Sequence, residues 1–177
     1  MHTIKATLLA VLACAISFGQ GSQMHYLSTG NTLPVWSKIT VANSGANFTV
    51  TCSPATTLCG TSPVAKAAAL TQSVTLLTLP AKGYILSCMA KSGTSFAGTT
   101  TLTATVGITG TLTACISGAY DLNAAVSNTN LSVALPATPI VSIAGTSVIL
   151  ALTGTISNLS SISAGSTDVW ILWSVLP

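Results

Sequence analysis

Residues Thr99 to Val106 read TTTLTATV, and this stretch decides the class of fold. Hydroxyl side chains alternate with apolar ones along it: Thr101, Thr103 and Thr105 on one side, Leu102, Ala104 and Val106 on the other. A period of two is typical of a β-strand with one solvent face and one core face. Glycines at positions 107 and 110 then predict a turn into a second strand over residues 111–116.

The rest of the chain past residue 30 has the same character. Short runs of Val, Ile, Leu and Thr are separated by Gly, Pro, Asn and Ser, and no stretch has a helical period of 3.6. We predict further strands over residues 72–79, 84–90, 131–135, 148–152 and 169–175. Seven to nine strands without helical intervals predict an all-β fold, an antiparallel β-sandwich of the jelly-roll type.

Two local patterns refine this prediction. Pro80-Ala81-Lys82-Gly83 has Pro first and Gly last, which is typical of a β-turn between two strands. In the terminal strand, Trp170 and Leu172 alternate with Ile171 and Trp173. Large residues on both sides of a strand predict that both of its faces are buried.

Charge is scarce in this sequence. Only 4% of the 177 residues are charged, five Lys and two Asp, against roughly 25% in an average soluble domain. A surface of Thr, Ser, Gly and Ala does little to prevent association with copies of itself, so self-assembly is expected. The net charge of +3 comes from scattered lysines with no Arg, which argues against nucleic acid as a partner.

The first residues have the layout of a secretory signal. Lys5 precedes an apolar run over residues 6–16, and Ser17-Phe18-Gly19 offers small residues where a signal peptidase cleaves. The sequence therefore predicts a signal peptide over 1–19, a flexible leader over 20–33 and one sandwich domain over 34–177. Two alternatives remain open: acylation at Cys14, and translation that begins at Met24, where Met-His repeats the opening dipeptide.

The remaining four cysteines form an even set in a chain that is predicted to be exported, so they are candidates for disulfides: Cys52, Cys59, Cys88 and Cys115. Cys52 and Cys59 bracket a short turn-rich segment, so a local bridge between them is the expected pairing. Cys88 and Cys115 lie in apolar strand-like runs, where a second bridge and free buried thiols are both open.

The sequence offers little for catalysis or ligand binding. Its mature carboxylate and imidazole side chains are Asp121, Asp168 and His25, and no catalytic, nucleotide or calcium-loop motif is present. The cysteine spacing does not fit a zinc site. We therefore expect no enzyme, no cofactor, no metal and no small-molecule substrate, and we interpret Asp121 and Asp168 as turn residues.

Part of the chain resembles a family of small tailed-phage virion-associated proteins. The residues that carry the likeness are Leu79 to Gly83, Phe96-Ala97-Gly98, Thr103 to Ile108, Gly110 to Thr113, Val35 to Thr40 and Ser163 to Leu172. The likeness covers about residues 34–177 and consists of turns and strand edges. It implies a β-sandwich with a structural role.

The sequence thus predicts a non-enzymatic structural subunit of an extracellular or virion-type assembly, in which Thr-rich faces and exposed strand edges pack on copies of the same chain. It would be secreted and would meet a membrane only during export, or lie in a virion if translation begins at Met24. The alternatives are a secreted adhesin or carbohydrate-binding sandwich, with Trp36, Tyr84 or Tyr120 as stacking residues, and a small outer-membrane barrel.

Overall fold

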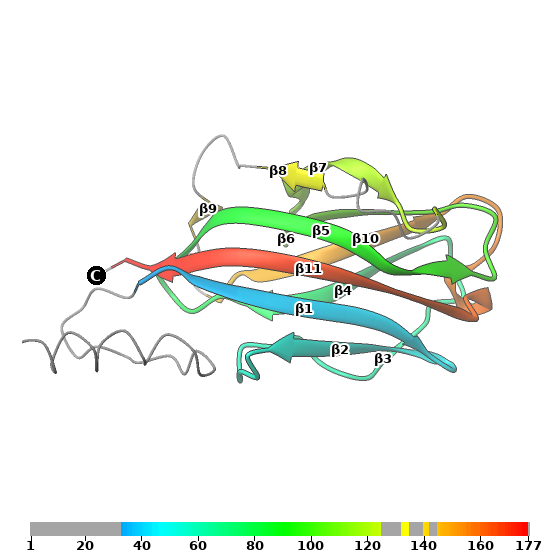
Figure 1. Cartoon of the computed structure of the whole chain (residues 1–177), viewed down its shortest axis with the longest axis horizontal. Helices are drawn as coiled ribbons and strands as arrows, with labels where there is room; N and C mark the ends of the chain where they lie inside the picture. The colour runs from blue at the N-terminus through cyan, green and yellow to red at the C-terminus, as the bar shows by residue number, and fades with distance from the viewer. Residues whose placement is uncertain (1–32, 125–131, 135–139, 142–144, 177) are drawn as a thin grey trace, which may run out of the picture.

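Two β-sheets pack face to face in this protein (Figure 1). The computed structural model describes residues 33–124, 132–134, 140–141 and 145–176. One sheet has seven strands, in the order β3-β2-β1-β11-β5-β8 with β9 also paired to β5, and the other has four, in the order β4-β10-β6-β7. We refer to them as the seven-stranded and the four-stranded sheet.

Every pairing between neighbouring described strands is antiparallel. The seven-stranded sheet consists of β1 (Val35–Ser44), β2 (Asn47–Ser53), β3 (Val64–Ala65), β5 (Gly83–Ala97), β8 (Ser132–Ala134), β9 (Ile140–Val141) and β11 (Ala164–Val175). The four-stranded sheet consists of β4 (Thr71–Thr78), β6 (Leu102–Ile108), β7 (Thr111–Asp121) and β10 (Ser147–Gly154). No helix in the described ranges is long and apolar enough to cross a membrane.

The chain passes between the two sheets in the order of a jelly roll. β1, β11, β5 and β8 are neighbours in one layer, and β4, β10, β6 and β7 in the other, so consecutive strands mostly change layer. Of these eight strands, β6 and β7 are consecutive in one sheet and form a hairpin. β2 and β3 extend the seven-stranded sheet beyond β1. The predicted antiparallel, jelly-roll-like sandwich is confirmed.

The predicted strands lie within observed ones, except at the ends. The TTTLTATV stretch supplies β6, and the runs at 148–152 and 169–175 lie inside β10 and β11. The predicted turn is also present: Gly83 donates its amide hydrogen to Pro80 O at 2.9 Å, and Lys82 has a φ of 62°. Of the predicted strand at 131–135, residues 132–134 form β8 and the rest lie outside the described residues.

The core lies between the sheets because alternate residues of each strand face inward. Ile39 and Val41 of β1 belong to the same buried cluster as Leu150 and Leu152 of β10. Trp173 of β11 is also in this core, and its indole nitrogen donates a hydrogen bond to Ser37 Oγ at 3.0 Å. That bond satisfies the polar end of a buried ring.

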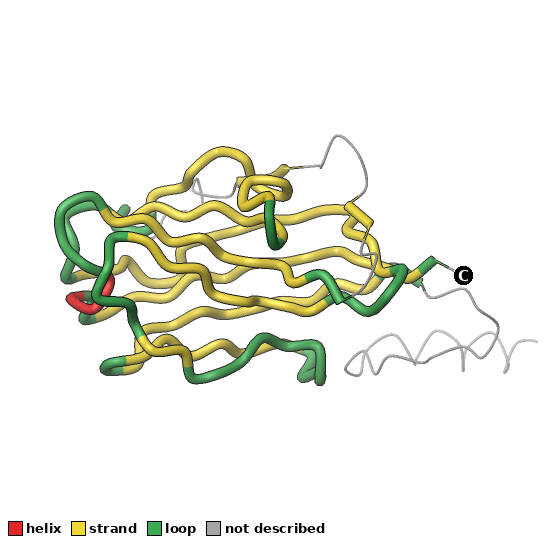
Figure 2. The backbone as a smooth tube through the Cα atoms, turned by 180° about the vertical axis from the view of Figure 1, so that it is seen from behind, coloured by secondary structure: helices red, strands yellow, loops and turns green. Residues whose placement is uncertain are grey.

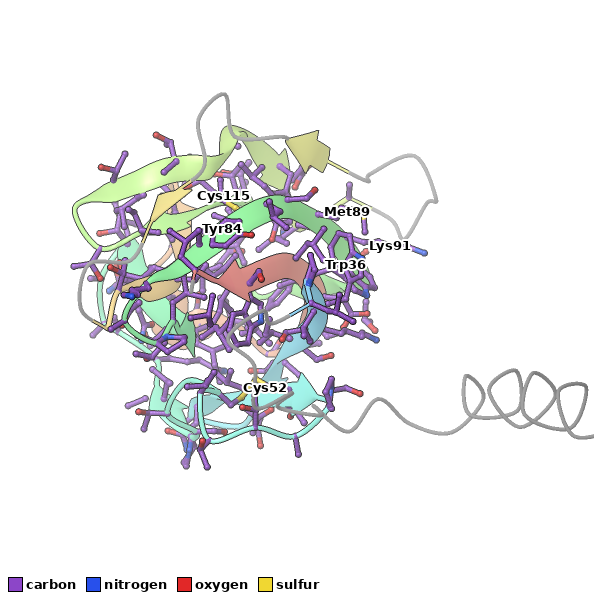
Figure 3. The ribbon with its side chains drawn as sticks, turned by 90° about the vertical axis from the view of Figure 1, so that its left-hand side faces the viewer. Trp36, Cys52, Tyr84, Met89, Lys91 and Cys115 are labelled. Carbon is purple, nitrogen blue, oxygen red and sulfur yellow. A yellow bond between two sulfur atoms is a disulfide. The ribbon has the colours of Figure 1, made fainter. Side chains whose placement is uncertain are left out.

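Two disulfides lie at opposite lateral margins of the sandwich, as the positions of Cys52 and Cys115 in Figure 3 show. Cys88 of β5 is bonded to Cys115 of β7, so one covalent bond joins the two sheets at that margin. At the other margin Cys52 of β2 is bonded to Cys59, which forms a β-bridge with Leu77 of β4. The Cα atoms are 5.9 Å apart in both pairs.

The segment around Cys59 covers the free edge of β4. The amide of Gly60 donates to Leu76 O at 2.9 Å, and the amide of Thr78 donates to Leu58 O at 2.7 Å. A Cβ at position 60 would lie 1.8 Å from Thr75 O, so only glycine allows this approach. The edge of β4 is therefore paired by the protein's own backbone over this length.

Candidate assembly surface

Large apolar side chains gather on the outward face of the seven-stranded sheet. Trp36 of β1 is opposite Leu172 of β11, and Trp170 of β11 is opposite Met89 of β5. Ser37 beside Trp36 is buried, and so are both strand neighbours of Met89, Trp170 and Leu172, so these four side chains face away from the core. Figure 3 shows Trp36, Met89 and Lys91 on the same side of the ribbon. We define the aromatic face as Trp36, Lys38, Met89, Lys91, Asp168, Trp170 and Leu172.

The aromatic face is partly open to solvent. Trp36 is 42% exposed, and Met89, Trp170 and Leu172 are half-buried by one another and by their neighbours in the sheet. The sequence predicts burial on both sides of β11, and this is wrong for its outward side. Ile171 and Trp173 are buried in the core, whereas no described strand covers Trp170 and Leu172 from outside.

Asp168 lies in the middle of this face and is held by two partners. Its Oδ2 is 3.0 Å from the Lys38 ammonium, and its Oδ1 accepts a hydrogen bond from Thr40 at 2.6 Å. The same ammonium lies 5.5 Å from the centroid of the Trp170 ring. The interpretation of Asp168 as a turn residue is therefore wrong, because β11 begins at Ala164 and Asp168 pairs with Lys91 inside the strand.

The outward face of the four-stranded sheet, on the side seen in Figure 2, has a different chemistry. Two cross-strand rows on it consist of small side chains, as in Thr71, Thr153 and Thr103, which are opposite one another on β4, β10 and β6. A third row contains Ile149, opposite Thr75 and Gly107. Asp121 of β7 ends this row, opposite Thr103. We define the hydroxyl face as Thr71, Ser73, Thr103, Thr105, Asp121, Ala151 and Thr153.

Asp121 also has a local role. Its Oδ1 accepts a hydrogen bond from the amide of Asn123 at 2.8 Å, which forms a turn directly after β7. The interpretation of Asp121 as a turn residue is confirmed. Because Asp121 and Asp168 lie on opposite outer faces of the sandwich, the structure does not bring the two carboxylates together.

The three predicted stacking residues lie in three different environments. Trp36 is part of the aromatic face, while Tyr84 lies near the start of β5, away from Trp36, Met89 and Lys91 in Figure 3. Tyr120 is buried in the core, where its hydroxyl lies 3.3 Å from Thr167 Oγ1, so it offers no surface for a ligand. Burial raises the pKa of Tyr120 above its usual range, and the hydrogen bond with Thr167 lowers it in part.

Sequence reasoning missed Trp170, Met89 and Leu172 as surface residues. The signal that could identify Trp170 and Leu172 is their alternation with Ile171 and Trp173, once one side of β11 is assigned to the core. Within the described ranges, no group of three or more His, Cys, Asp or Glu is placed to bind a metal ion.

Comparisons with known proteins concern the fold. No protein-family model matches the chain, and no curated protein matches it. A solved structure titled "Cyanophage Pam1 capsid asymmetric unit" contains a similar chain, with a TM-score of 0.50 and 18% sequence identity. The match covers 90% of this chain and 96% of that one. At 18% identity, this chain and the chain in that structure share a fold.

Proposed function

We propose that this protein is a non-enzymatic structural subunit of a virion-type assembly and that it functions by contact with copies of itself or with other subunits. The observation that carries the proposal is the aromatic face, where two tryptophans, a methionine and a leucine face outward. A surface of this kind on a sheet is typical of a protein interaction site. The likeness in fold to a chain of the cyanophage capsid structure supports the same role.

The placement of the ionisable groups supports a structural role. Asp168 is already bound by Lys38 and Thr40, and Asp121 binds the backbone of its own turn. A general acid or base must reach a substrate proton and must lie near a second catalytic group. Neither aspartate is placed in that way, because the two lie on opposite faces of the sandwich.

The environment of the assembly is part of the proposal. Two disulfides in one small domain fit an oxidising environment, which a chain reaches by export or in a released particle. We propose that residues 1–19 are removed as a signal peptide and that residues 34–177 act as one domain. A start at Met24 would instead place synthesis in the cytoplasm and the finished protein in a virion. Residues 1–32 lie outside the described part of the chain.

A second candidate function is carbohydrate binding, which Trp36 favours because an exposed indole can stack on a sugar ring. The neighbours of Trp36 favour protein contact instead. A sugar needs free hydrogen-bonding groups beside the ring, whereas Lys38 and Asp168 bind each other. Met89 and Leu172 add aliphatic surface, which suits a protein partner better.

The experiment that tests the proposal is the intact mass and the native size of the protein from its natural source. We expect a chain that begins at Gln20, is four hydrogens lighter than its reduced form, and belongs to a large assembly. A chain that begins at Met24 in a purified particle would keep the structural role and remove the signal peptide. A monodisperse monomer that binds glycans through Trp36 would replace the structural role with the second candidate.

A further inference from the structure

The edges of both sheets are poorly suited to pairing with another chain. In the seven-stranded sheet, β3 has two residues at one edge, and β8 and β9 have three and two at the other. In the four-stranded sheet, the edge of β4 is covered by the segment Leu58 to Gly60. β7 is irregular: its register against β6 shifts on both sides of the pair Val106 and Ile116. Short edges, covered edges and bulges all oppose the addition of a foreign strand. The outer faces of the two sheets are therefore better candidates for the contact than the described strand edges.

The two outer faces differ in the size of their side chains. The aromatic face presents Trp36, Trp170 and Met89, which stand above the sheet. The hydroxyl face presents Ser73, Ala151 and Thr105, three small side chains, in one cross-strand row. Large side chains on one surface pack well against small ones on the other. Two aromatic faces placed together would instead bring bulky groups against bulky groups.

The two faces also differ in charge. The aromatic face carries Lys38, Lys91 and Asp168, a sum of +1, and the hydroxyl face carries Asp121 and no lysine among its described residues, a sum of −1. Opposite charge on two surfaces of one chain favours their contact over contact between like surfaces. This electrostatic contribution is small. It favours contact between unlike faces, as the sizes of their side chains do.

We propose that copies of this chain pack front to back, with the aromatic face of one copy on the hydroxyl face of the next. This inference rests on the proposed function and specifies the contact within the assembly. Because two different surfaces meet, the contact is heterologous, and it builds a ring if the rotation closes or an open filament if it does not. Trp36 and Trp170 would then be covered by the row that contains Thr105.

The test uses two variants, each with one face blocked. Trp36→Glu places a charge in the aromatic face, and Thr105→Arg places a large cation in the hydroxyl face. Each is expected to raise the dissociation constant of the assembly by at least about thirtyfold, as for a residue at the centre of an interface. Mixed in equal amounts, the two variants keep one intact face each, so light scattering should detect a species of two chains and nothing larger.

Controls separate the contact from folding. Ile156→Glu changes a side chain that is 72% exposed and lies between β10 and β11, off both faces, and should assemble as the natural protein does. Circular dichroism and thermal unfolding check each variant, and Met89→Glu replaces Trp36→Glu if that variant does not fold. Asp121→Lys should weaken assembly by about fivefold, and high salt should reduce this loss.

The outcomes distinguish this inference from the proposed function. If the natural protein assembles and Thr105→Arg assembles equally well, or if the mixed variants do not associate, the front-to-back contact is wrong and the structural role survives. If the natural protein does not associate with itself at any concentration, the self-contact is refuted, and the structural role survives only as contact with other subunits. If a glycan then binds at Trp36, the structural role fails as well.

Discussion

Lys38 and Asp168 form an ion pair across β1 and β11, with Nζ 3.0 Å from Oδ2, on the surface where the largest exposed aromatic side chains lie. Thr40 donates to the second carboxylate oxygen at 2.6 Å. The pair neutralises the carboxylate where any partner would contact this face. The Lys38 ammonium also lies 5.5 Å from the centroid of the Trp170 ring, so it interacts with both the carboxylate and the aromatic surface.

Loss of the Asp168 carboxylate should therefore cost more stability than loss of the other aspartate. Asp168→Ala leaves Lys38 and Thr40 without their partner, and we expect the free energy of unfolding to fall by about 1–2 kcal/mol. Asp121→Ala, the matched control, loses one exposed hydrogen bond from the Asn123 amide and should change it by about 0.5–1 kcal/mol. Urea denaturation with the disulfides intact measures both, and equal losses would show that the partners of Asp168 contribute no more than one exposed hydrogen bond.

The two disulfides should differ in their contribution. The closed loops have sequence separations of 7 and 27 residues, and loop entropy predicts about 2–3 kcal/mol for Cys52 to Cys59 and about 3–4 kcal/mol for Cys88 to Cys115. Double Cys→Ala variants are suitable because Cys88 and Cys115 are buried among apolar residues. Guanidinium denaturation measures the loss in free energy of unfolding for each double variant. A larger loss without the Cys52 to Cys59 bond would contradict the prediction from loop length.

Stability at alkaline pH should depend on Tyr120. Burial raises the pKa of this phenol, whereas in the unfolded chain it ionises near its ordinary value of about 10. The folded state therefore holds the proton more tightly, so the contribution of Tyr120 is complete below pH about 10 and is lost as the pH rises further. The free energy of unfolding should fall more steeply with pH in the natural protein than in Tyr120→Phe, and parallel curves would contradict this.

The buried hydrogen bond between Trp173 and Ser37 should contribute to stability through the indole nitrogen. Ser37→Ala leaves that donor without a partner in the core, and we expect a loss of about 1–3 kcal/mol. Trp173→Phe removes the donor itself. It should therefore lower the free energy of unfolding by less in the Ser37→Ala variant than in the natural protein. A double-mutant cycle by chemical denaturation measures this coupling. Additive losses would show that the hydrogen bond contributes no coupling energy.

Local patterns predicted most of the four-stranded sheet. The alternation from Thr101 to Val106 is the pattern of a strand with one solvent-facing side and one buried side, and β6 is such a strand. The turn at Pro80 to Gly83 needs only Pro and Gly at fixed positions. These features depend on neighbours in the sequence, which a single chain displays directly.

Features that depend on distant neighbours could not be predicted. The exposure of Trp170 depends on whether another layer covers β11, and the sequence of β11 is the same in either case. The pairing of Cys88 with Cys115 depends on β5 and β7 meeting at one margin of the sandwich. The aromatic face exists because β1 and β5, far apart in the chain, both pair with β11.

The placement of the two disulfides has a mechanical consequence. One bond joins β5 to β7 directly, and the other joins β2 to a segment that is hydrogen-bonded to β4, so both margins of the sandwich are closed. A tensile force that pulls the layers apart must stretch covalent bonds at one margin and shear hydrogen bonds at the other. Such a unit resists separation of its two layers at both margins.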